Sequence, residues 1–213
     1  MNASDKLHPP GQRQGVVFNA FGCPKGLLGV IGGWLMARTN VELNAWAVSQ
    51  LDVQPDDYIL EVGSGPGVAI REIAERAAKG LVVGIDPSDV MIRQARKRNA
   101  AGIKAGRVEL HQGSVVSLPY EDSSFDKVLS VNNIMLWPGP GESMKEVRRV
   151  LKPGGCLVIT LNPRWAKTPL DVEDMGREIT MCVSEAGFIH TNTEFRKLKP
   201  AGAVTVTAIV PGS

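Results

Sequence analysis

Cysteine is scarce in this chain of 213 residues, and its three cysteines are far apart. Cys23, Cys156 and Cys182 form no CxxC pair. An odd number of scattered cysteines argues against both a disulfide framework and a zinc site. We therefore predict no bound metal, and we interpret the three cysteines as small apolar residues in a reducing compartment.

The chain also has little net charge and few aromatic rings. Its 24 basic and 22 acidic residues leave a net charge of +2, and aromatic side chains make up 5% of the sequence. Proteins that bind nucleic acids usually carry a basic stripe or a platform of aromatic rings for base stacking. We therefore expect no nucleic-acid partner.

Long apolar runs are missing as well. The longest, at residues 26–37, is shorter than the roughly 20 residues that a membrane-spanning helix needs. Residues 1–10 are polar and do not resemble a signal peptide. We expect a cytoplasmic protein with no stable membrane insertion. The glycine-rich segment 21–29 leaves a peripheral membrane contact open, although we favour packing against its own domain.

Apolar runs alternate with helix-like periodicity from about residue 46 onward. Buried strands are predicted at 58–62, 81–85, 107–110, 126–131 and 156–161, and helices at 68–79, 88–99, 142–151 and 172–186. Two more strands, near 188–195 and 203–210, follow one another without a helix between them. This predicts an antiparallel hairpin at one edge of a mostly parallel sheet. The pattern indicates an α/β, three-layer, Rossmann-like fold with seven strands, one of them antiparallel.

The first 45 residues differ in character from the rest. We predict a helical cap segment at 1–45 and a binding domain at 46–213, which together form a single structural domain. One helix is expected at 25–37. A second is expected from Thr39 to Leu51, where Thr39 and Glu42 have the spacing of a capping box.

A glycine-rich turn follows the first buried strand. Its sequence is ILEVGSGPG, and Gly63, Gly65 and Gly67 have GxGxG spacing. Glycines let the backbone turn sharply and approach a ligand, and the start of the next helix points free amides at that ligand. Asp86 ends the second strand, where a carboxylate can accept hydrogen bonds from both hydroxyls of a ribose. Together these features indicate a nucleotide-type site at the carboxyl ends of the strands.

Two classes of enzyme share this arrangement. Dinucleotide oxidoreductases have GxGxxG, whereas here Pro66 separates the last two glycines. The terminal hairpin also disfavours that fold. A nicotinamide-dependent oxidoreductase therefore stays as an alternative with less support.

Four segments in order resemble the motifs of class I S-adenosylmethionine-dependent methyltransferases. The resemblance is to the broad family of small-molecule, ubiquinone-biosynthesis-type and methyltransferase type 11-like enzymes, and it covers about residues 46–210. The segments are LEVGSGPG, GIDPS, GSVVSLPYEDSSFDKVLSVNNIMLW and RRVLKPGGCLVIT. The resemblance implies S-adenosylmethionine as cofactor, S-adenosylhomocysteine as product, and methyl transfer to a small-molecule acceptor. We expect this acceptor to be apolar or aromatic.

The resemblance also implies roles for single residues. Glu61 and the Gly63–Gly67 loop would hold the methionine part of the cofactor, and Asp86 would hold its ribose. The other members would surround the adenine, apart from Asn132, which would lie beside the methionine end. The implied cofactor residues are Glu61, Gly63, Ser64, Gly65, Gly67, Asp86, Pro87, Met91, Gly113, Ser114, Val115 and Asn132.

One position departs from the family pattern. The family usually has an aspartate after the glycine that matches Gly113, and it accepts a hydrogen bond from the adenine amino group. This chain has Ser114 there. A serine hydroxyl accepts without charge assistance, so we expect a weaker contact, and Gln112 is an alternative partner.

The sequence assigns no catalytic base. A sulfonium carries its own activation, so the protein mainly supplies alignment and desolvation. His8, His111 and His190 are interpreted as surface or structural residues. The acceptor is expected between the N-terminal segment and residues 132–141. Candidate acceptor residues are Phe18, Trp34, Asn133, Met135 and Trp137. A non-catalytic adenosylmethionine-binding or partner-binding module is a further alternative, and the oligomeric state is left open.

Overall fold

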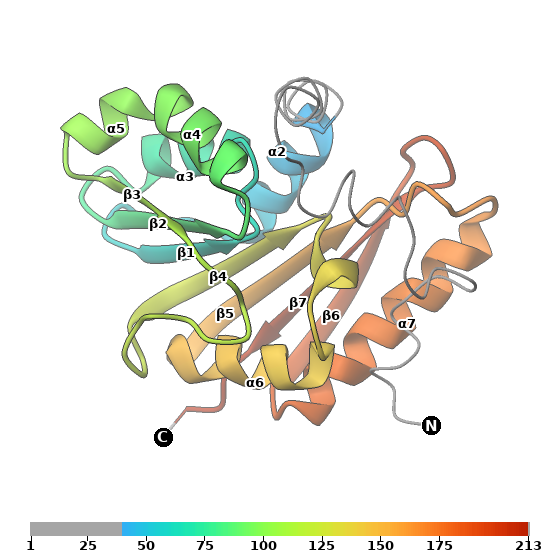
Figure 1. Ribbon diagram of the computed structural model, residues 1–213. Coiled ribbons are helices and arrows are strands. Elements are labelled where there is room, and N and C mark those ends of the chain that lie inside the picture. The colour runs from blue at the N-terminus through green and yellow to red at the C-terminus, as the bar shows by residue number, and fades with distance from the viewer. Residues whose placement is uncertain (1–39, 213) are drawn as a thin grey trace.

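The computed structural model describes residues 40–212, built around a seven-stranded sheet (Figure 1). The strand order is β3-β2-β1-β4-β5-β7-β6. The strands are β1 Tyr58–Val62, β2 Leu81–Asp86, β3 Val108–Gln112, β4 Phe125–Val131, β5 Leu151–Leu161, β6 Ile189–Arg196 and β7 Ala203–Ile209. β7 pairs antiparallel with both β5 and β6, and the other pairings are parallel. The predicted fold class, with one antiparallel strand from the C-terminal hairpin, is confirmed.

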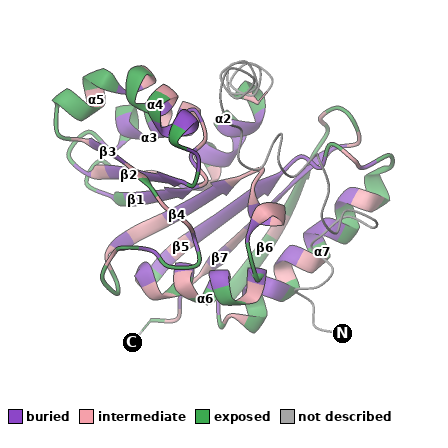
Figure 2. Cartoon of the chain, in the orientation of Figure 1, coloured by how far each residue is buried: buried purple, intermediate pink, exposed green. Residues whose placement is uncertain are grey.

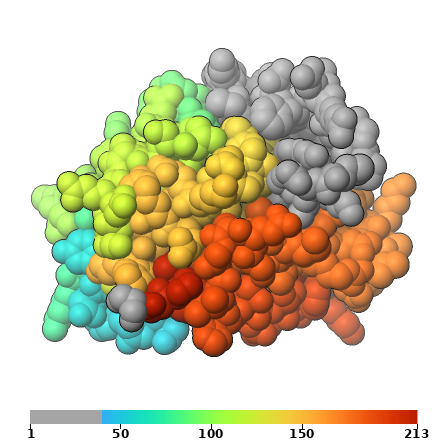
Figure 3. Space-filling view, turned by 90° about the horizontal axis from the view of Figure 1, so that it is seen from below, coloured from blue at the N-terminus to red at the C-terminus, as the bar shows by residue number. Residues whose placement is uncertain are grey.

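Helices cover both faces of the sheet. They are α2 Val41–Gln50, α3 Val68–Arg76, α4 Asp89–Arg98, α5 Ala100–Lys104, α6 Pro140–Val150 and α7 Pro169–Glu185, with a 3-10 helix, η3, at Ile134–Leu136. α2 to α5 lie on one side, and α6 and α7 lie on the other (Figure 1). From below, α6 and α7 lie side by side over their face (Figure 3). The three layers are therefore helix, sheet and helix.

The alternation of side chains along the strands builds a separate apolar core under each helical layer. In β1, Ile59 packs toward α2 and α3, whereas Leu60 and Val62 pack toward α6 and α7. Figure 2 shows the strands largely buried and the outer helix surfaces exposed. Because side chains alternate along a strand, Glu61 points to the same face of the sheet as Ile59. Its carboxyl group is therefore on the α2–α3 side, at the end of a buried strand.

Several boundaries differ from the predicted ones. α4 begins at Asp89, one residue after the predicted start, because Ser88 is its N-cap and accepts from the Met91 amide at 3.4 Å. α7 begins at Pro169, three residues before the predicted start, because Thr168 and Asp171 form a capping box that the sequence reading missed. β5 begins directly after α6 at Leu151, so the predicted break at 152–155 is wrong. Neither α5 nor η3 was predicted as a separate element.

Some of the predictions for the N-terminal segment concern residues that the structure does not describe. Thr39 and the predicted helix at 25–37 lie outside the described residues. The N-cap of α2 is Asn40, which makes no side-chain capping bond among the described residues. The division at residue 45 falls inside α2 and stays a prediction. Within residues 40–212, no helix is long and apolar enough to span a membrane.

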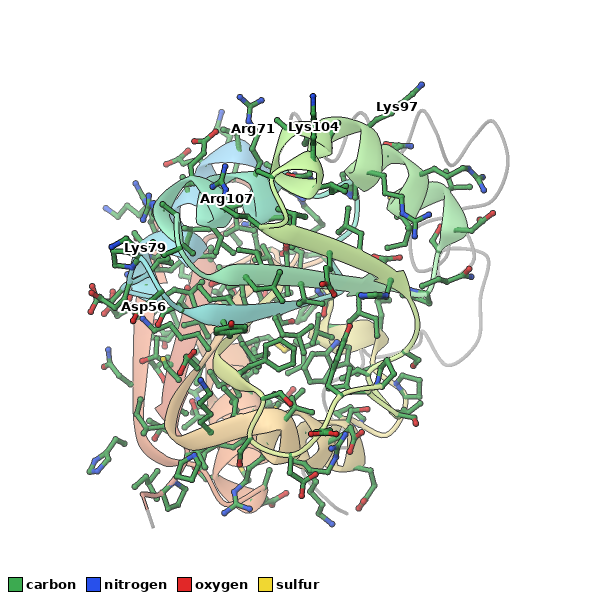
Figure 4. All side chains as sticks on the ribbon, turned by 90° about the vertical axis from the view of Figure 1, so that its left-hand side faces the viewer. Asp56, Arg71, Lys79, Lys97, Lys104 and Arg107 are labelled. Carbon is green, nitrogen blue, oxygen red and sulfur yellow. The ribbon has the colours of Figure 1, made fainter. Side chains whose placement is uncertain are left out.

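The basic side chains of α4 and α5 divide between solvent and the backbone of neighbouring elements. In Figure 4, Lys97 and Lys104 extend outward from the helices. Arg93 pairs with Asp89 one helical turn earlier. Arg96 and Arg98 instead donate to the backbone carbonyls of Leu110 and Pro66. Part of this basic run therefore fastens α4 to the neighbouring β3 and glycine loop.

Candidate active site

A cavity of about 310 Å³ lies at the carboxyl ends of the central strands. It is lined by the glycine loop, the ends of β2 and β4, the turn after β3, the η3 loop and the start of α2. Its lining residues are Asn40, Asn44, Glu61, Val62, Gly63, Ser64, Gly65, Pro66, Val68, Ile85, Asp86, Pro87, Met91, Gly113, Ser114, Val115, Val131, Asn132, Asn133, Leu136, Trp137 and Pro138. The structure thus brings together most of the predicted site, which is spread over some 80 residues of sequence.

Eleven of the twelve implied cofactor residues line this cavity, and Gly67 does not. Gly67 has a left-handed backbone (φ +72°) at the N-cap of α3, and its carbonyl accepts from Asn99 at 3.0 Å. A Cβ at this position would lie 2.6 Å from Asn99 Nδ2 and 2.9 Å from the Ala95 Cβ. Gly67 therefore serves the close packing of the turn against α4.

Asp86 fixes the shape of the glycine loop. Its Oδ2 accepts from the backbone amide of Gly65 and its Oδ1 from that of Ser88, both at 2.8 Å. Burial raises the pKa of the Asp86 carboxyl group, and these two amide bonds oppose that rise. Each carboxylate oxygen has a further lone pair for a ligand.

Glu61 and Ser64 present buried polar atoms that have no partner among residues 40–212. Glu61 Oε2 and Ser64 Oγ are both buried without a hydrogen bond, and both residues line the cavity. Burial raises the pKa of Glu61 well above its usual value, the Asp86 charge raises it further, and a backbone hydrogen bond from Ile70 opposes the rise. Buried polar groups are nearly always paired in native proteins, so unpaired ones at a cavity indicate a polar ligand.

Asn133, a predicted acceptor residue, lines the cavity, but its polar atoms are engaged within the protein. Its Nδ2 donates to the Val62 carbonyl at 2.7 Å, and its Oδ1 accepts from Ser130 Oγ at 2.8 Å and from the Trp137 indole at 2.7 Å. A Cβ on Gly63 would lie 2.4 Å from this Nδ2. Asn133 therefore joins the η3 loop to the glycine loop, and it has no amide group left for a ligand.

The other acceptor predictions have mixed outcomes. Trp137 lines the cavity, but Met135 does not and packs against the apolar core instead. Leu136 and Pro138 line the cavity in its place. Phe18 and Trp34 lie outside the described residues. Asn40 and Asn44, which were not predicted, reach the cavity from the start of α2.

Gln112 and the described histidines lie away from the cavity. Gln112 Nε2 donates to the Pro87 carbonyl at 3.1 Å, so this side chain is engaged on the protein surface, whereas Ser114 lines the cavity. His111 lies within β3 beside Glu109, and His190 is exposed on β6. His8 lies outside the described residues. In the described part of the chain, no group of His, Cys, Asp and Glu residues could hold a metal ion.

Comparisons with known proteins agree on one family. Residues 59–155 match the model of a family described as "Methyltransferase domain". The chain is 37% identical over 185 residues to the uncharacterized methyltransferase YdaC of Bacillus subtilis, covering 86% of this chain and all of that protein.

A second relative matches only in part. The ubiquinone/menaquinone biosynthesis C-methyltransferase UbiE of Geotalea daltonii is 34% identical over 115 residues, which is 54% of this chain and 49% of UbiE. The fold resembles a crystal structure of a SAM-dependent methyltransferase from Aquifex aeolicus, with a TM-score of 0.67 and 19% identity over 81% of this chain and 93% of that one. Its sequence, fold and full-length match to YdaC show that the chain belongs to the class I S-adenosylmethionine-dependent methyltransferases.

Proposed function

We propose that the chain transfers a methyl group from S-adenosylmethionine to a small apolar or aromatic acceptor, and that both molecules occupy the cavity at the carboxyl ends of the strands. The observation that carries this proposal is the unpaired, buried Oε2 of Glu61 beside the glycine loop. A carboxylate in that position is suited to the ammonium group of the methionine part, which would supply the missing partner.

Three further groups suit the rest of the cofactor. Asp86 is oriented by two backbone amides and retains lone pairs for the ribose hydroxyls. Ser114 lines the cavity beyond β3 and can accept from the adenine amino group. At Gly65 a Cβ would meet no atom within 4 Å, so the loop leaves open space for a ligand to approach its backbone.

When bound, S-adenosylmethionine supplies a methyl group on a positively charged sulfur, and the methyl passes to the acceptor as the carbon–sulfur bond breaks and its electron pair stays on sulfur. The chain then has to align the acceptor and to exclude water. Val131, Leu136 and Pro138 provide apolar walls on the β4 side. The buried Trp137 adds a ring held by Asn133.

The apolar walls support an apolar acceptor. The chain matches about half the length of UbiE, which is named as a ubiquinone/menaquinone biosynthesis C-methyltransferase. This supports a ring-bearing acceptor here without identifying it. We keep a small-molecule rather than a nucleic-acid substrate, and a cytoplasmic location, as parts of the same proposal.

The test is a titration followed by an activity assay on the full chain. Calorimetry with S-adenosylhomocysteine should give saturable binding at one site, and NADH should not compete for it. Transfer of labelled methyl from S-adenosylmethionine is then measured against a panel of quinols, phenols and aromatic amines. Tight binding without transfer to any acceptor would favour the non-catalytic alternative, and competition by NADH would favour the oxidoreductase.

A further inference from the structure

Three carboxamide side chains stand on the α2–β4 side of the cavity. Asn40 and Asn44 lie one helical turn apart at the start of α2, and Asn132 follows β4 directly. α2 packs against β4 and β5, so these side chains come from neighbouring elements. Because an amide both donates and accepts, the atoms already in use determine what each of the three offers to a ligand.

Asn132 offers a donor. Its Oδ1 accepts from the backbone amide of Asn162 at 2.7 Å, and a backbone N–H can only donate, so the oxygen end of the side chain is fixed. Its Nδ2 group has no acceptor among residues 40–212. The backbone of Asn132 is in the left-handed region (φ +57°), which asparagine tolerates better than most residues.

Asn44 offers an acceptor. Its Nδ2 donates to the backbone carbonyl of Asn40 at 2.8 Å, and a carbonyl can only accept, so the nitrogen end is fixed. Its Oδ1 has no donor among residues 40–212. Asn44 is 8% exposed and lines the cavity, so this carbonyl is in position to accept from a ligand there.

The groups behind these amides hold them in place. Asn162 is 5% exposed, and its Nδ2 donates to the Gly202 carbonyl at 2.6 Å. Arg164 donates to Asn40 Oδ1 at 3.0 Å, which ties the start of α2 to the loop after β5. The orientation of the Asn132 and Asn44 amides is therefore built into the fold.

We propose that Asn132 and Asn44 form a subsite for a hydroxyl group of the methyl acceptor, with Asn132 Nδ2 donating to the hydroxyl oxygen and the hydroxyl hydrogen donating to Asn44 Oδ1. A hydroxyl is a small neutral group that satisfies one donor and one acceptor at once. An ether oxygen satisfies only the donor, and a methyl group satisfies neither. The inference rests on the proposed function, and it narrows the acceptor class to apolar molecules that carry a hydroxyl group.

The experiment uses three probes that share one ring: naphthol, methoxynaphthalene and methylnaphthalene, each substituted at the same ring position. Each is titrated into the full chain saturated with S-adenosylhomocysteine. Naphthol is expected to bind about tenfold more tightly than methylnaphthalene, which pairs with neither amide, and methoxynaphthalene should lie between them because it pairs only with the donor.

Two variants then assign the preference to the two amides. Asn44→Leu removes the acceptor and should bring naphthol down to the affinity of methoxynaphthalene or below. Asn132→Asp keeps an oxygen for the Asn162 amide and removes the donor, so it should weaken naphthol and methoxynaphthalene but not methylnaphthalene. Asn192→Leu, on the exposed strand β6, is the matched control and should leave all three affinities unchanged.

The outcomes separate this inference from the proposed function. If S-adenosylhomocysteine fails to bind the wild-type chain, the proposed function fails. If it binds and naphthol shows no preference over methylnaphthalene, or does not bind, the hydroxyl subsite is overturned while the cofactor site stands. A naphthol preference that survives in both variants also overturns it. Each variant is first compared with the wild type by circular dichroism and thermal unfolding, so that a misfolded variant is recognised and the other one decides.

Discussion

The backbone amide of Gly65 donates a 2.8 Å hydrogen bond to Oδ2 of Asp86. The end of β2 thereby fixes the loop that follows β1, across 21 residues of sequence. The amides of Gly63 and Ser64 add to this by donating to the Ile85 carbonyl at 2.8 and 3.1 Å. The Asp86 carboxylate thus shapes the glycine loop and also lines the candidate cofactor cavity. Both the geometry of the loop and the affinity of the cavity for its ligand should therefore depend on Asp86.

Replacing Asp86 should therefore weaken cofactor binding strongly. Asp86→Ala is expected to lower the affinity for S-adenosylhomocysteine by at least about tenfold, because the Gly65 and Ser88 amides and the ligand lose a charged acceptor. Isothermal titration calorimetry measures the effect. Asp174→Asn is the control, since this carboxylate is exposed on α7 and pairs with Arg177. Equal affinities for Asp86→Ala and the wild type would remove Asp86 from the site.

Two glycines with similar backbones should separate strain from ligand contact. Gly65 (φ +50°) and Gly106 (φ +68°) both have a left-handed backbone, and a Cβ on either would meet no atom within 4 Å. Alanine at either position should cost about 1–2 kcal/mol of unfolding free energy. Only Gly65→Ala should also weaken S-adenosylhomocysteine binding, because only Gly65 lines the cavity. Denaturant unfolding measures the stability cost in both variants, and calorimetry measures their affinity for S-adenosylhomocysteine. An equal fall in affinity in the two variants would contradict the prediction.

Local motifs explain why much of this site could be predicted from the sequence. The glycine turn and the Ser88 cap are short patterns whose chemistry depends on neighbouring residues. The role of Asn133 could not be predicted in this way, because its 2.7 Å bond to the Val62 carbonyl joins positions 71 residues apart. Asn44 was missed for a similar reason. On a helix it looks like an ordinary polar residue, and it reaches the cavity only because α2 packs over β4.

Glu61 should make the ligand-free protein less stable as the pH rises. Burial, and then the Asp86 charge, raise its pKa in the folded state above the ordinary value of 4.5. At pH values between 4.5 and the folded-state pKa, Glu61 is protonated more often in the folded chain than in the unfolded chain. The contribution of Glu61 protonation to the unfolding free energy is therefore complete below pH 4.5 and is lost as the pH rises through the folded-state pKa. Glu61→Gln should thus be more stable than the wild type at neutral pH and equal to it in acid.

The measurement is the difference in unfolding free energy between variant and wild type across pH. Asp86 also has a raised pKa, so both proteins keep some slope, and their difference isolates Glu61. Glu75→Gln, in an exposed pair with Arg71, should show little change at any pH. The same Glu61→Gln variant should bind S-adenosylhomocysteine at least about tenfold more weakly, since it loses a charged partner. If Glu61→Gln were less stable than the wild type at neutral pH, the raised pKa assigned to Glu61 would be contradicted.

Asn133 and Trp137 should be energetically coupled through their 2.7 Å hydrogen bond. Trp137→Phe keeps the ring and removes the indole N–H, so it should cost about 1 kcal/mol of unfolding free energy. In an Asn133→Ala background that bond is already absent, and the same change should cost about 1 kcal/mol less, as a double-mutant cycle by denaturant unfolding would measure. Trp165→Phe is the matched control, because the buried Trp165 indole nitrogen has no partner in the described part of the chain and its removal breaks no bond there. Additive costs for Asn133→Ala and Trp137→Phe would mean that the bond contributes nothing to the link between the η3 loop and the glycine loop.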